Sequence, residues 1–289
     1  MNTIADGRDP RALFARTYQD LVDHWPVPVT ALDVPTGYGM THVLICGEHG
    51  APAVFLLPGG GATATAWRDV AAGLSVSHRV IAADPIGQPG LSTPGGQPIK
   101  NALDLVSWLD QVLDSLTITG ATLIGHSYGA WIVLRYAMHV PSRVSKLVLL
   151  DPTDTFAPLS LRYRLKAIPQ LARPSSQRMR RFLAWETRGQ PLDPAWLAVA
   201  AAGQDLGHAR IVMPRRPRRG ELADLHAPVL VIVAGRSRAH DPARIARLAR
   251  DRLPNVASAT LAQATHHSIP TEDAPETLRH IKPFLASEN

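Results

Sequence analysis

Short apolar runs alternate with helical patterns along most of this chain, and this alternation restricts the fold more than any other feature. The runs are rich in Val, Ile and Leu, which is typical of strands buried on both faces of a parallel sheet. Parallel strands need long crossovers, usually helices, so the pattern indicates the α/β class. The sequence predicts eight strands, of which the first two form an antiparallel pair: 29–34, 40–46, 53–57, 79–83, 121–124, 146–150, 228–234 and 256–262.

Helices are predicted after the fourth, seventh and eighth of these strands, at 100–116, 242–253 and about 275–285. The first of them places Leu103, Val106, Leu109 and Leu113 on one face. From about 152 to 226 the alternation stops, and helix-forming pieces at 159–168, 176–187 and 194–203 are separated by Pro and Gly. We therefore expect one α/β domain over 1–289, with a helical lid inserted at about 152–226 after the sixth strand.

Composition excludes several classes of protein. With 289 residues, 45% of them apolar, the chain is able to bury a full core. Its single cysteine, Cys46, cannot form an internal disulfide, and no Cys/His cluster indicates a metal site. The charged N-terminus lacks the apolar run of a signal peptide, and no stretch approaches the roughly 18 apolar residues of a membrane span. We expect a cytoplasmic protein with no membrane partner, no metal and no organic cofactor.

The net charge of +6 comes from the expected lid, where twelve Arg and one Lys face six acidic residues. No helix-turn-helix, RNA-binding signature or basic stripe with interleaved aromatics is present, so we expect no nucleic-acid partner. One hypothesis is that the basic lid attracts a small-molecule substrate that carries an anionic group. The alternative is that the preference for Arg over Lys reflects codon usage.

The segment Gly125-His126-Ser127-Tyr128-Gly129 lies between a predicted strand, ATLI, and a helical stretch, AWIVLRYAMH. A GxSxG motif at a strand-to-helix turn is typical of a nucleophile elbow, in which two glycines permit a strained turn that exposes the serine oxygen. The motif alone is common, and a plain glycine-rich turn is the alternative. The strand before it and the helix after it favour Ser127 as a nucleophile.

Acyl transfer also needs oxyanion donors and a general base. The backbone N–H of Tyr128 is one candidate donor. Gly60, in the Pro58-Gly59-Gly60-Gly61 loop after the strand AVFLL, is the other. Two adjacent histidines, His266 and His267, follow the last strand, and we expect His267 to be the base, with His266 as the alternative.

The segments GHSYG, LLPGGGATATAW, ADPIGQPGLS and THHSIP together resemble the α/β-hydrolase superfamily. The segments TYQDLVDHWPVPVT, GYGMTHVLICGEHGAP, DPTDTFAPL and VIVAGRSRAHDP are similar to bacterial carboxylesterases of the naproxen-esterase type. The resemblance covers essentially the whole chain. It implies the fold, the lid, Ser127 as nucleophile and His267, in its His-x-x-Pro pattern, as base.

The chain departs from this family pattern at two places. Pro58 stands where the oxyanion loop usually begins with His. The family's acid usually lies three residues after the glycine that ends the seventh strand, but Arg238 occupies that position after Gly235. Asp151, at the end of the sixth strand, is our first candidate for the acid. Asp241 is the second, although Asp241-Pro242 is also typical of a helix start; Asp154 is a weaker third, and a dyad without an acid remains an alternative.

These residues predict a serine hydrolase that cleaves a carboxylic ester, lactone or thioester through an acyl-enzyme. Two alternatives remain open from the sequence. One is a non-hydrolytic enzyme of the same fold, such as a lyase, a perhydrolase or a biosynthetic acyl transferase or cyclase, because fold does not fix reaction. The other is a hydrolase-like receptor that binds a small ligand without turnover.

Overall fold

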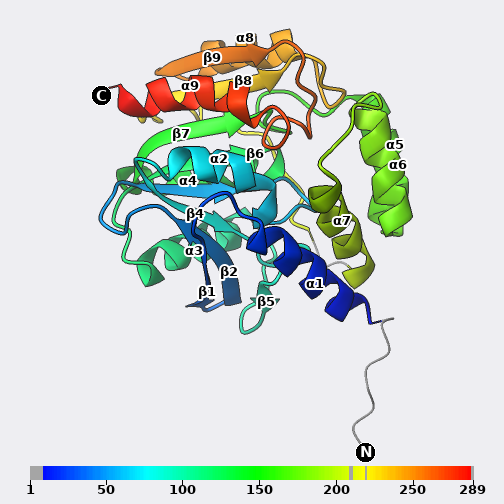
Figure 1. Cartoon of the computed structure of the whole chain (residues 1–289). Coiled ribbons are helices and arrows are strands. Elements are labelled where there is room, and N and C mark those ends of the chain that lie inside the picture. The colour runs from blue at the N-terminus through cyan, green and yellow to red at the C-terminus, as the bar shows by residue number, and fades with distance from the viewer. Residues whose placement is uncertain (1–8, 208–210, 219, 288–289) are drawn as a thin grey trace, which may run out of the picture.

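One mainly parallel sheet forms the centre of the computed structural model, which describes residues 9–207, 211–218 and 220–287 (Figure 1). The strand order is β1-β2-β4-β3-β6-β7-β8-β9, with the short β5 paired to β2. The strands are β1 (Thr30–Thr36), β2 (Gly39–Cys46), β3 (Ala53–Leu57), β4 (Arg79–Ala83), β5 (Thr93–Pro94), β6 (Ala121–His126), β7 (Val144–Leu150), β8 (Val229–Ala234) and β9 (Val256–Leu261).

All eight predicted strands are present, and the first two pair antiparallel as expected. The six neighbouring strands β4-β3-β6-β7-β8-β9 pair in parallel. Every residue of β6 and β8 is buried, which is why these strands are continuous apolar runs in the sequence. The two-residue β5 is too short to produce a periodic pattern, and the sequence did not predict it.

Helices cover both faces of the sheet (Figure 1). Phe55 and Leu57 of β3 pack on the face covered by α3, α4 and α8, whereas Val54 and Leu56 pack on the face of α1, α2 and α9. The helices are α1 (Pro10–Asp23), α2 (Arg68–Leu74), α3 (Ala102–Ser115), α4 (Tyr128–His139), α5 (Leu161–Ala172), α6 (Ser176–Glu186), α7 (Pro194–Gly203), α8 (Pro242–Arg252) and α9 (Ala274–Ala286), with 3-10 turns at Ala64–Trp67, Pro141–Arg143 and Gln204–Leu206.

Helix α3 lies where the sequence predicted a helix, at 100–116, but the prediction of its buried face was wrong at one residue. Val106, Leu109 and Leu113 are buried as expected, whereas Leu103 is 57% exposed. Leu103 lies in the first turn, between the two residues of a capping box, Asn101 and Asp104, and it faces solvent beside the helix end. The inward face is completed instead by Leu105, Trp108 and Val112.

Between β7 and β8 the chain forms α5, α6 and α7, and no strand occurs in the part of this segment that the structure describes. Helix α7 packs against α1, while α5 and α6 lie at the outer edge of the molecule, away from the sheet (Figure 1). Across the described residues, no helix combines the length and apolarity that crossing a membrane requires. These three helices extend over the carboxyl ends of the strands, where Ser127 directly follows β6 and Asp151 directly follows β7.

Candidate active site

Ser127 occupies a strained turn between β6 and α4. Its backbone angles are φ 52° and ψ −114°, a conformation that non-glycine residues rarely adopt. The flanking glycines make the turn possible: a Cβ on Gly125 would lie 2.5 Å from the backbone of Gly129, and one on Gly129 would lie 2.3 Å from the Leu57 carbonyl oxygen. This is the geometry that the GxSxG motif predicted.

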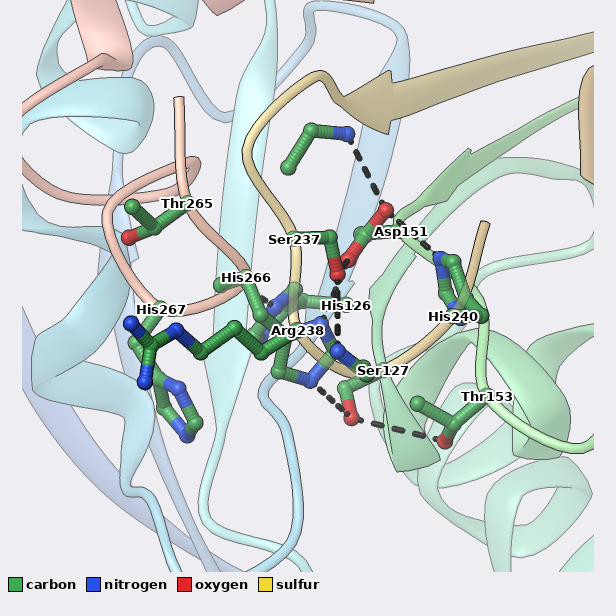
Figure 2. A network of polar contacts seen from close by, with 12 residues as sticks. His126, Ser127, Asp151, Thr153, Ser237, Arg238, His240, Thr265, His266 and His267 are labelled. Carbon is green, nitrogen blue, oxygen red and sulfur yellow. Dashed lines mark hydrogen bonds and ion pairs between the residues drawn. The ribbon is translucent and has the colours of Figure 1, made fainter. Parts of the chain in front are cut away.

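His266, on the loop after β9, approaches the serine (Figure 2). Its Nε2 lies 2.9 Å from Ser127 Oγ, and its Nδ1 lies 2.6 Å from Asp151 Oδ2. A carboxylate accepts hydrogen bonds only, so Nδ1 carries the proton and Nε2 is free to accept the serine hydroxyl. Burial lowers the pKa of His266 and Asp151 opposes this only in part, so the ring is neutral at pH 7.

The structure does not bring His267 to the serine, which corrects the expectation that this residue faces Ser127. Adjacent residues on a loop point in different directions, and the rings of His266 and His267 are nearly perpendicular. His267 donates from Nδ1 to Glu186 Oε2 at 3.0 Å. Glu186, the last residue of α6, also accepts the backbone N–H groups of His266 and His267 at 3.0 and 3.2 Å.

Glu186 is fully buried and remains ionised. Burial raises the pKa of Glu186, but the hydrogen bond from His267 and the nearby His266 bring it below its ordinary value. The carboxylate thus holds the backbone of the histidine pair and binds the His267 ring, while the His266 ring faces Ser127. No local sequence pattern predicts this role, because Glu186 lies 80 residues before His266.

His126, inside the elbow, supports the same loop from the other side. Its Nε2 lies 2.7 Å from the backbone carbonyl oxygen of His266, to which it donates. Burial, together with the neighbouring His266 and His267, holds the pKa of His126 well below its usual range. His126 is therefore a neutral donor that holds the main chain of His266 close to Ser127.

Asp151, at the end of β7, receives four hydrogen bonds. Oδ1 accepts from the Ala234 backbone N–H at 3.0 Å and from His240 Nε2 at 2.8 Å. Oδ2 accepts from the Ser237 hydroxyl at 2.8 Å and from His266. Burial raises the pKa of Asp151, but His240 and His266 hold it well below its usual range. All of its lone-pair directions are occupied, as an ionised buried carboxylate requires.

The loop after β8 has no carboxylate at the family's usual position and instead supplies Ser237 and His240 to Asp151 (Figure 2). The Arg238 guanidinium lies 4.8 Å from the ring centre of Trp185. Asp241 is exposed and caps α8 by accepting from the N–H groups of Ala243 and Arg244. Asp241 is thus a helix cap away from His266, while Asp154 lines the adjacent cavity.

The predicted oxyanion residues border Ser127. Tyr128 is the first residue of α4, and the first N–H groups of a helix have no acceptor within the helix. The glycine loop packs closely on the elbow: a Cβ on Gly59 would lie 3.2 Å from Ser127 Cβ, and one on Gly60 would lie 3.6 Å from Tyr128 Cβ. The loop is held by Gly61, whose N–H donates to Gln88 and whose carbonyl accepts from Gln204.

A cavity of about 480 Å³ opens at Ser127. Its wall is mainly apolar, and Asp154 is the charged carboxylate in it; no Arg or Lys among the described residues lines it. The same part of the chain contains no group of three or more His, Cys, Asp or Glu side chains able to hold a metal ion. The apolar wall includes Leu159, Tyr163, Leu171, Met179, Phe182, Trp196, Ile211 and Met213, and Gln88, Gln170 and Gln204 add amide groups.

Comparison with known proteins agrees with this architecture. The family model of the alpha/beta hydrolase fold matches residues 52–173. The chain is 26% identical to nap, an uncharacterized carboxylesterase of Bacillus subtilis (strain 168), over 92% of this chain and 90% of the relative. It is 31% identical to the carboxylesterase YbfK of the same organism, over 50% of this chain and 48% of the relative. The crystal structure of naproxen esterase (carboxylesterase NP) from Bacillus subtilis superposes with a TM-score of 0.88 at 25% identity, covering 96% of this chain and 99% of that one.

The chain has the α/β-hydrolase fold. Within that fold class, the chain is similar to bacterial carboxylesterases over nearly its whole length, and it is a carboxylesterase-like enzyme.

Proposed function

We propose that this protein hydrolyses neutral carboxylic esters through an acyl-enzyme on Ser127, with His266 as the general base and Asp151 as the acid that orients it. The observation that carries the proposal is the continuous chain of hydrogen bonds from Ser127 Oγ to His266 and on to Asp151, at 2.9 and 2.6 Å. These hydrogen bonds place the proton of His266 on Nδ1 and leave Nε2 free to accept the serine proton, as base catalysis needs.

In the first step, Ser127 Oγ attacks the ester carbonyl carbon while His266 Nε2 takes the hydroxyl proton. The backbone N–H groups of Gly60 and Tyr128 stabilise the oxyanion, and each such donor contributes about 3 to 4 kcal/mol to the transition state. The C–O bond to the alcohol then breaks, and His266 returns its proton to the leaving oxygen. Water, deprotonated by the same nitrogen, then attacks the acyl carbonyl carbon. The bond from that carbon to Ser127 Oγ breaks, His266 returns the proton to Ser127 Oγ, and the carboxylic acid leaves.

The substrate class follows from the cavity wall. Apolar side chains such as Phe182 and Trp196 gain free energy when they cover an apolar acyl or alcohol group. An anionic group would meet no Arg or Lys side chain among the described residues of the wall, and Asp154 would repel it. We therefore propose uncharged esters in place of the anionic substrates suggested by the basic segment. Neutral and carboxylate-bearing esters of matched size, compared across a salt series, test this choice.

The assignment of the base is tested by comparing two adjacent residues. His266→Ala is expected to lower kcat/KM by about a thousandfold, since it removes the group that accepts the serine proton. His267→Ala keeps that group and is expected to retain far more activity. Equal losses in the two variants, or a larger loss in His267→Ala, would contradict the proposal.

The nucleophile and the acid are tested separately. A fluorophosphonate probe is expected to label the wild-type protein rapidly and to leave Ser127→Ala unlabelled. Asp151→Asn is expected to slow turnover by about four orders of magnitude, because the imidazole loses its orienting carboxylate. Asp241→Asn is the matched control, and a larger effect there than at Asp151 would overturn the assignment. A protein that binds ligands but is not labelled would be a receptor.

A further inference from the structure

Helix α5 exposes its apolar side chains to solvent. Leu161, Leu165 and Ile168 are 66%, 58% and 52% exposed and are spaced as i, i+4 and i+7, so they form one stripe along the helix. The buried residues of this helix, Tyr163 and Gln170, lie on the opposite side. The more apolar face of α5 therefore points away from the protein core, the reverse of an ordinary surface helix.

The exposed stripe continues to the mouth of the cavity. Leu171 is 55% exposed and Met213 is 77% exposed, and both also line the cavity that opens at Ser127. We call Leu161, Leu165, Ile168, Leu171 and Met213 together the α5 face. Figure 1 places α5 at the outer edge of the molecule, where the rest of the protein does not block access to an extended surface.

Basic residues flank the stripe on both sides. At 100° per residue, Arg164 lies on one side of the stripe, and Arg162 and Lys166 lie on the other; all three are exposed. No acidic residue occurs within 161–172, and Arg178, Arg180 and Arg181 of the neighbouring α6 are also exposed. A second copy of this face would bring like charges together. An anionic surface, in contrast, would satisfy both the apolar stripe and its charges.

We propose that the α5 face docks on the surface of a membrane that contains anionic lipids. The aliphatic side chains would enter the boundary between headgroups and acyl chains, while Arg162, Arg164 and Lys166 would reach the lipid phosphates. Such docking is contact with one leaflet and needs no membrane-spanning helix. It revises the expectation that the protein has no membrane partner, and it does not depend on the proposed hydrolysis.

Co-sedimentation with lipid vesicles tests the proposal, using the full chain with Ser127→Ala so that no lipid is consumed. Vesicles of phosphatidylcholine with about 30% phosphatidylglycerol are expected to bind the protein at least tenfold better than pure phosphatidylcholine, and salt should weaken this binding. Adding Leu165→Gln and Ile168→Gln should reduce binding about tenfold or more. Arg164→Gln should reduce it on the order of fivefold, the effect of one charge near an anionic surface.

Matched controls show whether the effect belongs to this face. Val76→Gln and Leu103→Gln replace exposed apolar residues on other elements, at 85% and 57% exposure, and should bind like the parent. Circular dichroism confirms that each variant is folded. No preference for anionic vesicles, or equal binding by the Leu165→Gln/Ile168→Gln variant, would overturn the proposal. A dimer that these two substitutions dissociate, without vesicle binding, would show that a second copy covers the face.

Discussion

Nε2 of His240 lies 2.8 Å from Oδ1 of Asp151, on the carboxylate oxygen that His266 does not use. The acid is thus held between two histidines, of which one faces Ser127 and the other does not (Figure 2). A buried carboxylate that lacked one of its four donors would be less firmly oriented toward His266. We therefore expect His240 to act as a positioning residue, through Asp151.

His240→Leu is expected to lower kcat by about tenfold to a hundredfold while KM changes little. The physical reason is that a hydrogen bond to a buried charge contributes about 1.5 to 3 kcal/mol, and here it supports a group needed in the transition state. Steady-state kinetics on a neutral ester measures the effect. Asp241→Asn, next in the chain but at an exposed helix cap, is the control and should leave kcat unchanged. An unchanged kcat in His240→Leu would show that three donors suffice.

Much of this site could be predicted from residues that are close in sequence. Ser127 follows from a local pattern, since strand, glycines and helix together force the turn. Asp151 follows from its place at a strand end, because parallel strands bring their carboxyl ends to one edge. The choice between His266 and His267 could not be predicted, since it depends on Glu186 and His126, which are distant in the chain.

Glu186→Gln is expected to affect both turnover and stability. An amide places an NH₂ group where the carboxylate accepts two backbone N–H groups and the His267 ring, so at least one buried donor loses its acceptor. Each unsatisfied donor costs about 1 to 3 kcal/mol. Urea denaturation should show this loss in the free energy of unfolding, and kcat should fall more than KM rises. Glu48→Gln, at an exposed position, serves as the comparison. Equal kcat and equal free energies of unfolding in the two variants would show that Glu186 does not support the site.

The pH dependence of kcat/KM should reflect the neutral state of His266. Only the unprotonated ring accepts the serine proton, and burial lowers the pKa of His266 below its ordinary value of 6.5. Activity should therefore persist as pH falls through 6.5 and decline only at lower pH, as the ring becomes protonated. Rates on a neutral ester from about pH 4.5 to 8 measure the midpoint of this acid limb. A midpoint above 6.5 would mean that Asp151 outweighs burial.

Lys146 gives a prediction about stability that is independent of catalysis. This residue of β7 is only 7% exposed, and its Nζ donates to the backbone carbonyls of Phe284, Leu285 and Ser287 at the end of α9. The carbonyls of Phe284 and Leu285 belong to the last turn of α9 and have no backbone N–H partner within the helix, and the helix dipole favours a cation there. Lys146→Met is expected to lower the free energy of unfolding by about 2 to 4 kcal/mol, because three charge-assisted bonds are lost and the carbonyls stay covered. Urea denaturation measures the change. Lys282 is an exposed lysine of α9, and the free energy of unfolding of Lys282→Met should lie within about 0.5 kcal/mol of the wild type.

Since Lys146 lies near the start of β7 and Asp151 follows its end, fluorophosphonate labelling of the folded Lys146→Met variant should proceed at the wild-type rate. Equal stabilities of the two lysine variants would show that water replaces Nζ at the helix end at no cost.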